Sequence, residues 1–263
     1  MPLSCEKANP IRWPSSSGRS ANQSMKSVAI IPARLASTRL PRKMLREVAG
    51  KPLVGWVYEA VRSSTLLADV IIATDSDEIL ETCDRHGWKA QMTSAAHRSG
   101  TERVHEISNS VAADVYINVQ GDEPLVRPEQ IGTLLEVMKD AAVQVGTVKT
   151  PCPLEDVNNP NAVKVVTAPG GGALYFSRAT IPFDRDGTAP RYFKHLGLYA
   201  YRKPALDLFV SRPESTLEKS ERLEQLRFLE NGIPIFVGET AYDSVGVDTE
   251  EDLQRVAEIL RKR

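Results

Sequence analysis

Four basic side chains follow a predicted strand near the start of the chain. Residues 28–32 are continuously apolar and mostly β-branched, which predicts a strand buried on both faces. The loop after this strand, residues 33–43, carries Arg34, Arg39, Arg42 and Lys43. Arginine offers a planar fork of donors and lysine a point charge, and both suit phosphate oxygens. The pattern favours a phosphate site over its alternative, a solvated basic loop.

Two aspartates could supply a metal site beside those phosphates. Asp122 follows a predicted strand in "NVQGDEP", and Asp248 follows a short apolar run in "VGVDTEEDL". Mg²⁺ prefers carboxylates together with phosphate oxygens, so the two aspartates could hold one or two Mg²⁺ ions there. Glu123 could equally be the ligand, and each aspartate could instead cap a helix. Gly121 would let the backbone approach a ligand closely.

Other chemistries lack their signatures. The chain contains neither GxGxxG nor GxxxxGK[ST], so dinucleotide-binding and P-loop sites are not indicated. Its four histidines form no HxxxH or HExxH pair, which argues against zinc. No catalytic triad can be argued. His195 alternates with Tyr199 and Tyr201 on one face of a predicted strand, and that face could line a polar pocket or pack in the core.

The composition of the chain excludes further classes of protein. The 263 residues include 33 basic and 34 acidic side chains, so a general affinity for nucleic acid or membranes is not expected. No apolar run approaches the roughly 18 residues that a membrane span needs. Three cysteines without a CxxC pair fit the cytoplasm. Residues 1–24 are rich in Pro and Ser, which predicts a disordered tail or a true start at Met25.

The remaining residues predict one α/β domain, 25–263, built on a doubly wound, mostly parallel sheet. Its first half alternates strands with helices, and ligands on such sheets bind beyond the carboxyl ends of the strands. We therefore expect the loops at 33–43, 93–101 and 120–125 to converge. From about 145 to 232 the pattern changes to a mixed or antiparallel insert, which includes a hairpin over 165–176. The expected strands are 28–32, 69–74, 89–93, 114–120, 191–202 and 233–238, and the expected helices are 52–64, 76–87, 101–111, 127–140, 215–232 and 248–263.

Eight segments carry a resemblance to a known family. They are "IPARLASTRLPRKML", "MTSAAHRSGTER", "NVQGDEP", "NPNAVKVV", "ALYFSRATIPFDR", "KHLGLYAYR", "LEQLRFLENG" and "VGVDTEEDL", in this order. Together they closely resemble the 3-deoxy-manno-octulosonate cytidylyltransferase (CMP-Kdo synthetase) family, over roughly residues 26–260. Any one segment is modest support, whereas eight in order are specific.

The resemblance implies an activity. In this family CTP and the sugar acid 3-deoxy-D-manno-octulosonate (Kdo) give CMP-Kdo and diphosphate, for lipopolysaccharide biosynthesis. It also implies Mg²⁺ as cofactor and a homodimer formed through the insert. Two alternatives stay open: a cytidylyltransferase for another sugar acid, such as amino-Kdo or a sialic acid, and a non-catalytic nucleotide-binding module.

The resemblance also implies roles for individual residues. The catalytic set is Arg34, Lys43, Asp122 and Asp248, of which Asp122 and Asp248 bind the metal. The nucleotide should contact Pro32, Ala33, Arg34, Ser37, Lys43, Ser99, Gly100 and Arg103. The sugar acid should contact Gln120, Arg178, His195, Tyr199, Glu224 and Gln225. An arginine among them suits a sugar carboxylate.

Overall fold

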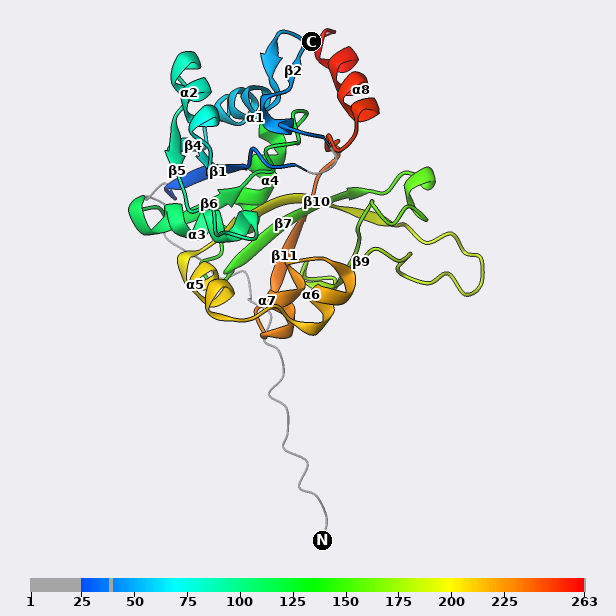
Figure 1. Cartoon of the computed structure of the whole chain (residues 1–263). Helices are drawn as coiled ribbons and strands as arrows, with labels where there is room; N and C mark the ends of the chain where they lie inside the picture. Colours follow the sequence, from blue (N-terminus) through cyan, green and yellow to red (C-terminus); the bar gives the residue numbers. More distant parts are fainter. Residues whose placement is uncertain (1–24, 38–39, 263) are drawn as a thin grey trace.

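A twisted sheet with helices on both faces forms the body of the protein (Figure 1). The computed structural model describes residues 25–37 and 40–262. The expected tail, 1–24, and Arg39 of the basic loop therefore lie outside the described residues.

The first half of the chain builds the parallel part of this sheet, as predicted. Strand β1 pairs in parallel with β4 and β6, and β4 pairs in parallel with β5. The bounds are β1 (Ser27–Ala33), β4 (Asp69–Thr74), β5 (Ala90–Met92) and β6 (Val115–Asn118).

The second half adds antiparallel strands to the same sheet. Strand β10 is antiparallel to β6 on one side and to β7 on the other, while β11 pairs in parallel with β7. The predicted hairpin is formed by β8 and β9, and β8 also pairs with β10. The bounds are β7 (Val145–Pro151), β8 (Lys164–Thr167), β9 (Ala173–Ser177), β10 (Phe193–Tyr201) and β11 (Ile235–Glu239). The predicted fold class is confirmed.

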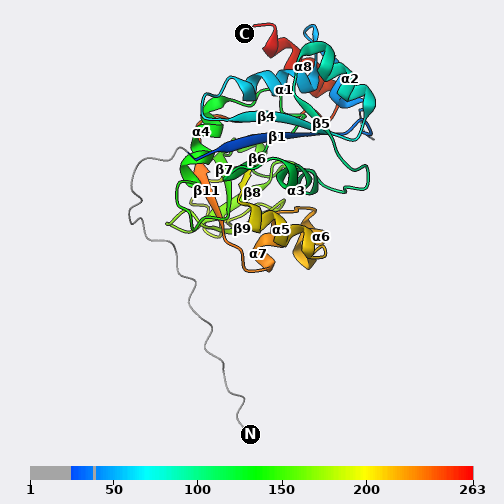
Figure 2. The same cartoon turned by 90° about the vertical axis from the view of Figure 1, so that its left-hand side faces the viewer.

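The unbroken apolar runs reflect burial on both faces of the sheet. In β1, Val28 and Ile30 pack toward one core and Ala29 and Ile31 toward the other, and all four are 0% exposed. Two layers of helices cover the faces (Figure 2). One layer is α1 (Leu53–Arg62), α2 (Asp77–His86) and α4 (Pro128–Val137), and the other includes α3 (Gly100–Ser110) and α5 (Lys203–Ser211). Alternating side chains therefore serve both cores, as in a doubly wound sheet.

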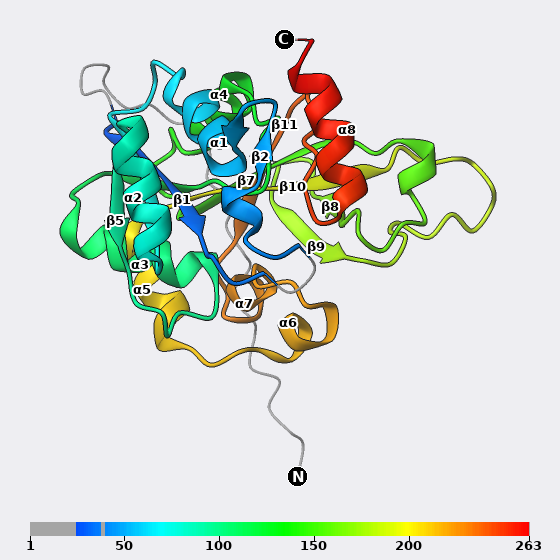
Figure 3. The same ribbon diagram turned by 45° about the horizontal axis from the view of Figure 1, so that its top comes forward.

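Side-chain caps fix where two helices near the ligand edge begin. The Ser99 hydroxyl accepts a hydrogen bond from the Glu102 N–H at 3.2 Å, which starts α3. The Thr249 hydroxyl does the same for the Asp252 N–H at 3.2 Å, which starts α8 (Glu250–Leu260). Such caps satisfy N–H groups that the helix itself leaves free. Figure 3 shows α8 beside β2 (Glu47–Val48), with which it shares a small apolar core.

The prediction of one helix over 215–232 is wrong. The segment forms α6 (Thr216–Glu221) and α7 (Leu226–Glu230), separated by Arg222 in the left-handed conformation with φ of 54°. Glu218 and Arg227 explain the break, because residues nine apart would lie on opposite sides of a continuous helix. The break brings them together as a buried ion pair, with Arg227 Nε 2.7 Å from a Glu218 oxygen.

Helix α5 was not predicted, although Pro204 in its first turn and its buried Ala205, Leu206 and Phe209 are typical of a helix start and an amphipathic face. None of the helices within 25–37 and 40–262 is long and apolar enough to cross a membrane.

Candidate active site

A hollow of about 320 Å³ lies where β1 and β6 end. The loops after these two strands meet there with the start of α3 and the residue that precedes the Thr249 cap. The convergence of loops expected at this edge of the sheet is therefore present. The residues that line the hollow are Pro32, Arg34, Ala36, Ser37, Lys43, Met44, Gly100, Gln120, Gly121, Asp122 and Asp248.

The ammonium group of Lys43 lies between the two predicted metal ligands. Its Nζ is 2.5 Å from Asp122 Oδ2 and 3.1 Å from Asp248 Oδ1. Burial by itself lowers the pKa of Lys43, but the two carboxylates outweigh it and raise this pKa above its ordinary value. Two carboxylates that are far apart in the sequence thus face one point, and a cation occupies that point.

This donor set fits Mg²⁺. Within the described ranges no group of three His, Cys, Asp or Glu side chains could enclose a metal. Mg²⁺ is commonly held by one or two carboxylates plus substrate phosphates and water, and does not need such a cage. The alternative ligand Glu123 turns elsewhere: its carboxylate accepts a hydrogen bond from the Ser244 hydroxyl at 2.7 Å. Burial raises the pKa of Glu123 to about 7.

Gly121 allows the close approach of the strand ends. A Cβ at this position would lie 2.7 Å from the backbone oxygen of Pro32 and 3.1 Å from Met44 Sδ. Real Cβ atoms do not approach a backbone oxygen this closely. The backbone after β6 can therefore lie against the end of β1 only with glycine here, as the sequence suggested for a ligand-facing turn.

Arg34 and Arg103 have different places in the site. Arg34 lines the hollow, and its guanidinium donates to the carbonyl of His97. Burial and the nearby charge of Arg103 lower the pKa of Arg34. Arg103 is 0% exposed, pairs with Asp75, and donates to Thr93 Oγ1 at 2.6 Å. It lines neither hollow and ties α3 to the residues that follow β4 and β5.

A second hollow, of about 400 Å³, adjoins the start of α3 on the side of α6 and α7. Ser99 and Glu224 line it, whereas the next residue after Ser99, Gly100, lines the first hollow. A Glu224 oxygen accepts a hydrogen bond from Thr101 Oγ1 at 2.8 Å. Burial raises the pKa of Glu224 above its ordinary value. The predicted nucleotide and sugar residues therefore meet across the first turn of α3.

Two glutamines predicted for the sugar lie in the same region. Gln120 lines the first hollow, and its amide donates to the carbonyl of Gly197 at 3.3 Å. Gln225 is 3% exposed, and its side-chain nitrogen has no hydrogen-bond partner among the described residues. A buried donor of this kind is costly unless a ligand or water meets it.

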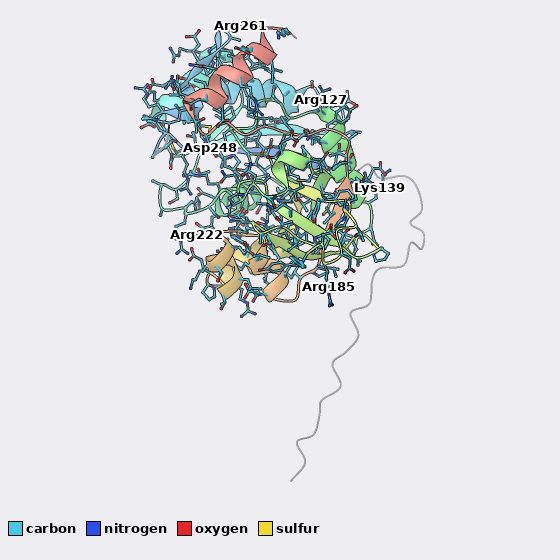
Figure 4. The ribbon with its side chains drawn as sticks, turned by 90° about the vertical axis from the view of Figure 1, so that its right-hand side faces the viewer. Arg127, Lys139, Arg185, Arg222, Asp248 and Arg261 are labelled. Atoms are coloured by element: carbon cyan, nitrogen blue, oxygen red, sulfur yellow. The ribbon has the colours of Figure 1, made fainter. Side chains whose placement is uncertain are left out.

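Like Arg103 and Gln225, four further predicted residues line neither hollow. Ala33 is buried in β1, and Tyr199 is buried in β10. His195 is also buried, contacts Thr147 Oγ1 at 2.9 Å, and has its pKa lowered to about 3 by burial. The guanidinium of Arg178 donates to the carbonyl oxygens of Pro160, Glu221 and Arg222. Figure 4 shows Arg222, whose carbonyl is one of these acceptors, on the same side of the molecule as Asp248 of the first hollow.

Two supporting residues were not predicted. Asp75 directly follows the strand 69–74, and this position at the ligand edge was a usable signal. Glu221 carries no such signal, because its partner Ser177 is 44 residues away in the sequence.

A basic loop and an acidic pair at the carboxyl edge of a doubly wound sheet are the features expected of a nucleotidyltransferase. A family model described as "Cytidylyltransferase" matches residues 28–237. The 3-deoxy-manno-octulosonate cytidylyltransferase of Koribacter versatilis (strain Ellin345) is 66% identical over 240 residues, which cover 91% of this chain and 92% of the relative. The chain belongs to the 3-deoxy-manno-octulosonate cytidylyltransferase family.

Further comparisons agree. The Geobacter sulfurreducens enzyme of the same name is 45% identical and covers 90% of this chain and 100% of its own. A solved structure of CMP:2-keto-3-deoxy-manno-octonic acid synthetase complexed with CTP superposes with a TM-score of 0.87 at 42% identity, over 90% of this chain and 99% of that one. The inositol-1-phosphate CTP transferase from T. maritima, at 14% identity and a TM-score of 0.64, shares the fold.

Proposed function

We propose that this protein is a Mg²⁺-dependent enzyme that transfers CMP from CTP to Kdo and releases diphosphate. The observation that carries the proposal is the meeting of Lys43, Asp122 and Asp248 at one point of a hollow where a strand-end basic loop and two glycines converge. The names of the relatives, and the CTP complex of the similar structure, support the choice of substrates. The product would supply lipopolysaccharide biosynthesis.

The triphosphate would lie in the first hollow. Arg34 and Lys43 offset its charge, and Ser37 and the backbone at Gly100 and Gly121 offer close polar contacts. Ser99 and Pro32 border the nucleoside, while Arg103 holds α3 in place behind it. Transfer of a phosphoryl group depends more on alignment and charge than on covalent catalysis.

Asp122 and Asp248 would hold Mg²⁺ together with phosphate oxygens. When bound, the ion neutralises the triphosphate and stabilises charge on the departing diphosphate. Lys43 is then free to interact with phosphate oxygens, since its two carboxylate partners are engaged.

The sugar acid would bind between Gln120 and the second hollow. Its anomeric hydroxyl attacks the α-phosphorus and gives its proton to solvent, so that a new O–P bond forms. The bond from the α-phosphorus to the bridging oxygen breaks, and diphosphate leaves with that oxygen and the electron pair. Gln225 presents a buried donor that has no partner among the described residues, and Glu224 presents a carboxylate that can accept from sugar hydroxyls. Arg178, His195 and Tyr199 stay proposed sugar residues, although their present contacts are to protein atoms.

A homodimer in the cytoplasm completes the proposal. The segment between β7 and β10 exposes three large apolar side chains, Leu154 at 87%, Phe183 at 85% and Leu174 at 58%. Exposed apolar groups of this size are typical of protein contacts. The cytoplasm is where CTP is available.

Diphosphate release by the purified protein tests the activity, with Mg²⁺ and freshly prepared Kdo against CTP, UTP, ATP and GTP in turn. Release with CTP alone, and only when Kdo is present, is the expected result. Release with amino-Kdo or a sialic acid in place of Kdo would move the assignment to that acid. CTP binding without release on any acid would favour the non-catalytic alternative.

A further inference from the structure

The carboxylate of Glu221 joins two segments that are far apart in the sequence. One oxygen accepts a hydrogen bond from the Ser177 hydroxyl at 2.6 Å, and the other accepts from the backbone N–H of Arg178 at 3.0 Å. The Tyr175 hydroxyl adds a longer contact of 3.4 Å to the first oxygen. The last residue of α6 is thereby fixed to the end of β9.

The side chain of Arg178 in turn contacts the end of α6. Its Nε donates to the backbone oxygen of Glu221 at 2.7 Å, and its Nη2 donates to that of Arg222 at 3.3 Å. Its own backbone oxygen accepts from Lys164 Nζ at 2.8 Å, and Lys164 is 0% exposed. The backbone of Arg178 is therefore held on both sides, by Glu221 at the nitrogen and by Lys164 at the oxygen.

Glu221 lies immediately before the turn that carries two of the proposed sugar residues. Arg222 turns the chain with φ of 54°, and Glu224 and Gln225 come next. Glu224 is anchored to Thr101 at 2.8 Å, in the first turn of α3. The short segment 221–225 is thus fixed at one end to β9 and at the other to the helix that borders the nucleotide hollow.

We infer that Glu221 is a positioning residue for the sugar acid: it sets Arg178 at the end of β9 in register with Glu224 and Gln225. Both carboxylate oxygens of Glu221 already accept hydrogen bonds, from the Ser177 hydroxyl and the Arg178 N–H, so Glu221 acts through those residues and does not touch substrate. The inference rests on the proposed function, because the three residues it aligns are the proposed sugar contacts.

Hydrogen-bond geometry, and not negative charge, is the property that this role needs. In Glu221→Gln the amide oxygen can accept from the Arg178 N–H while the amide nitrogen donates to Ser177 Oγ, so both links persist. In Glu221→Ala both are lost. Glu230 provides a matched control, because its exposed carboxylate accepts from the Leu217 N–H at 3.0 Å within the α6–α7 unit and makes no described hydrogen bond to β9.

The test compares KM for Kdo, kcat, and the Kd for CTP across the wild type and these three variants. We expect Glu221→Ala to raise KM for Kdo about tenfold or more, since displacement of aligned groups is costly, while the Kd for CTP stays within about twofold. Glu221→Gln and Glu230→Ala should stay close to the wild type. An unchanged KM in Glu221→Ala, a parallel loss of CTP affinity, or equal damage in Glu221→Gln would overturn the inference.

Amide hydrogen exchange keeps this test independent of the substrate assignment. In Glu221→Ala the amides of Arg178 and of residues 222–226 should exchange faster together, and in Glu230→Ala they should not. Unchanged exchange at both segments would show that Glu221 does not link them. A wild type that releases no diphosphate with Kdo would refute the proposed function alone, because the exchange result would still decide the link.

Discussion

Lys43 Nζ lies 2.5 Å from Asp122 Oδ2 and, with Asp248 at 3.1 Å, closes a bridge between the loop after β6 and the segment before α8. The lysine therefore occupies the point at which a divalent cation would neutralise the same two carboxylates. A protein cation and a metal ion cannot both take that point. With the proposed Mg²⁺ site, Lys43 would therefore compete with the metal until phosphates offer the ammonium group another partner.

Removing this competitor should strengthen metal binding in the absence of nucleotide. We expect Lys43→Met to bind Mn²⁺ about tenfold more tightly than the wild type, because the two carboxylates then repel each other without compensation. Titration of free Mn²⁺ by electron paramagnetic resonance measures this directly. Lys51→Met, which removes a lysine paired with Glu59 away from the site, should leave the affinity unchanged. Weaker or equal binding in Lys43→Met would contradict the competition.

The two aspartates should be needed for turnover and not for folding. Asp122→Asn and Asp248→Asn keep the shape of each side chain but remove the charge that would hold the proposed metal. Each should lower kcat by at least about a hundredfold while the unfolding transition stays near that of the wild type. Steady-state diphosphate release and thermal unfolding check the two halves. Near-normal turnover in both variants would contradict the proposal that these aspartates bind the metal.

Gly121 should tolerate no side chain. A Cβ there would lie 2.7 Å from the Pro32 backbone oxygen, so Gly121→Ala must displace the end of β1 or the loop after β6. We expect a loss of about 1–3 kcal/mol in the free energy of unfolding together with weaker CTP binding. Gly170→Ala is the matched control, because a Cβ at Gly170 would meet nothing within 4 Å. Denaturant titration and calorimetry with CTP measure both effects. Equal behaviour of the two variants would show that the loop yields easily.

His195 should make stability depend on pH in the acidic range. Its pKa falls from the ordinary 6.5 to about 3 because the folded protein buries the neutral ring. Below pH 6.5 the unfolded chain takes up a proton that the folded chain refuses, so this contribution is complete above 6.5 and is lost as the pH falls toward 3. When the pH falls from about 7.5 to 5, the free energy of unfolding of the wild type should decrease by about 2 kcal/mol more than that of His195→Gln. Denaturant unfolding at both values measures the difference, and parallel losses would mean that His195 is not held neutral.

The meeting of the basic loop and the acidic pair at one edge of the sheet could be predicted from the sequence because its signals are local. Each of Arg34, Lys43, Gly121 and Asp122 lies in a loop directly after a recognisable buried strand, and the topology of a parallel sheet brings strand ends together. Asp248 could be identified as a candidate in the same way, because an apolar run precedes it and a helix cap follows it.

The contacts that α6 and α7 make could not be predicted from the sequence in this way. The break at Arg222 depends on a buried ion pair between Glu218 and Arg227, and the helical spacing of this stretch gives no sign of it. The link from Glu221 to Ser177 spans 44 residues and has no spacing rule at all. Sheet register and loop contacts decide these positions, and both are set by tertiary packing.

The place of β10 in the sheet limits how this enzyme could change its acceptor. Because β10 lies between β6 and β7, the strands of the later segment share one hydrogen-bonded sheet and both apolar cores with the nucleotide half. The segment that carries the proposed sugar residues is therefore not a cassette that recombination could exchange without breaking the sheet. A change of acceptor within this fold would have to come from single substitutions in its loops, while the sheet itself stays unchanged.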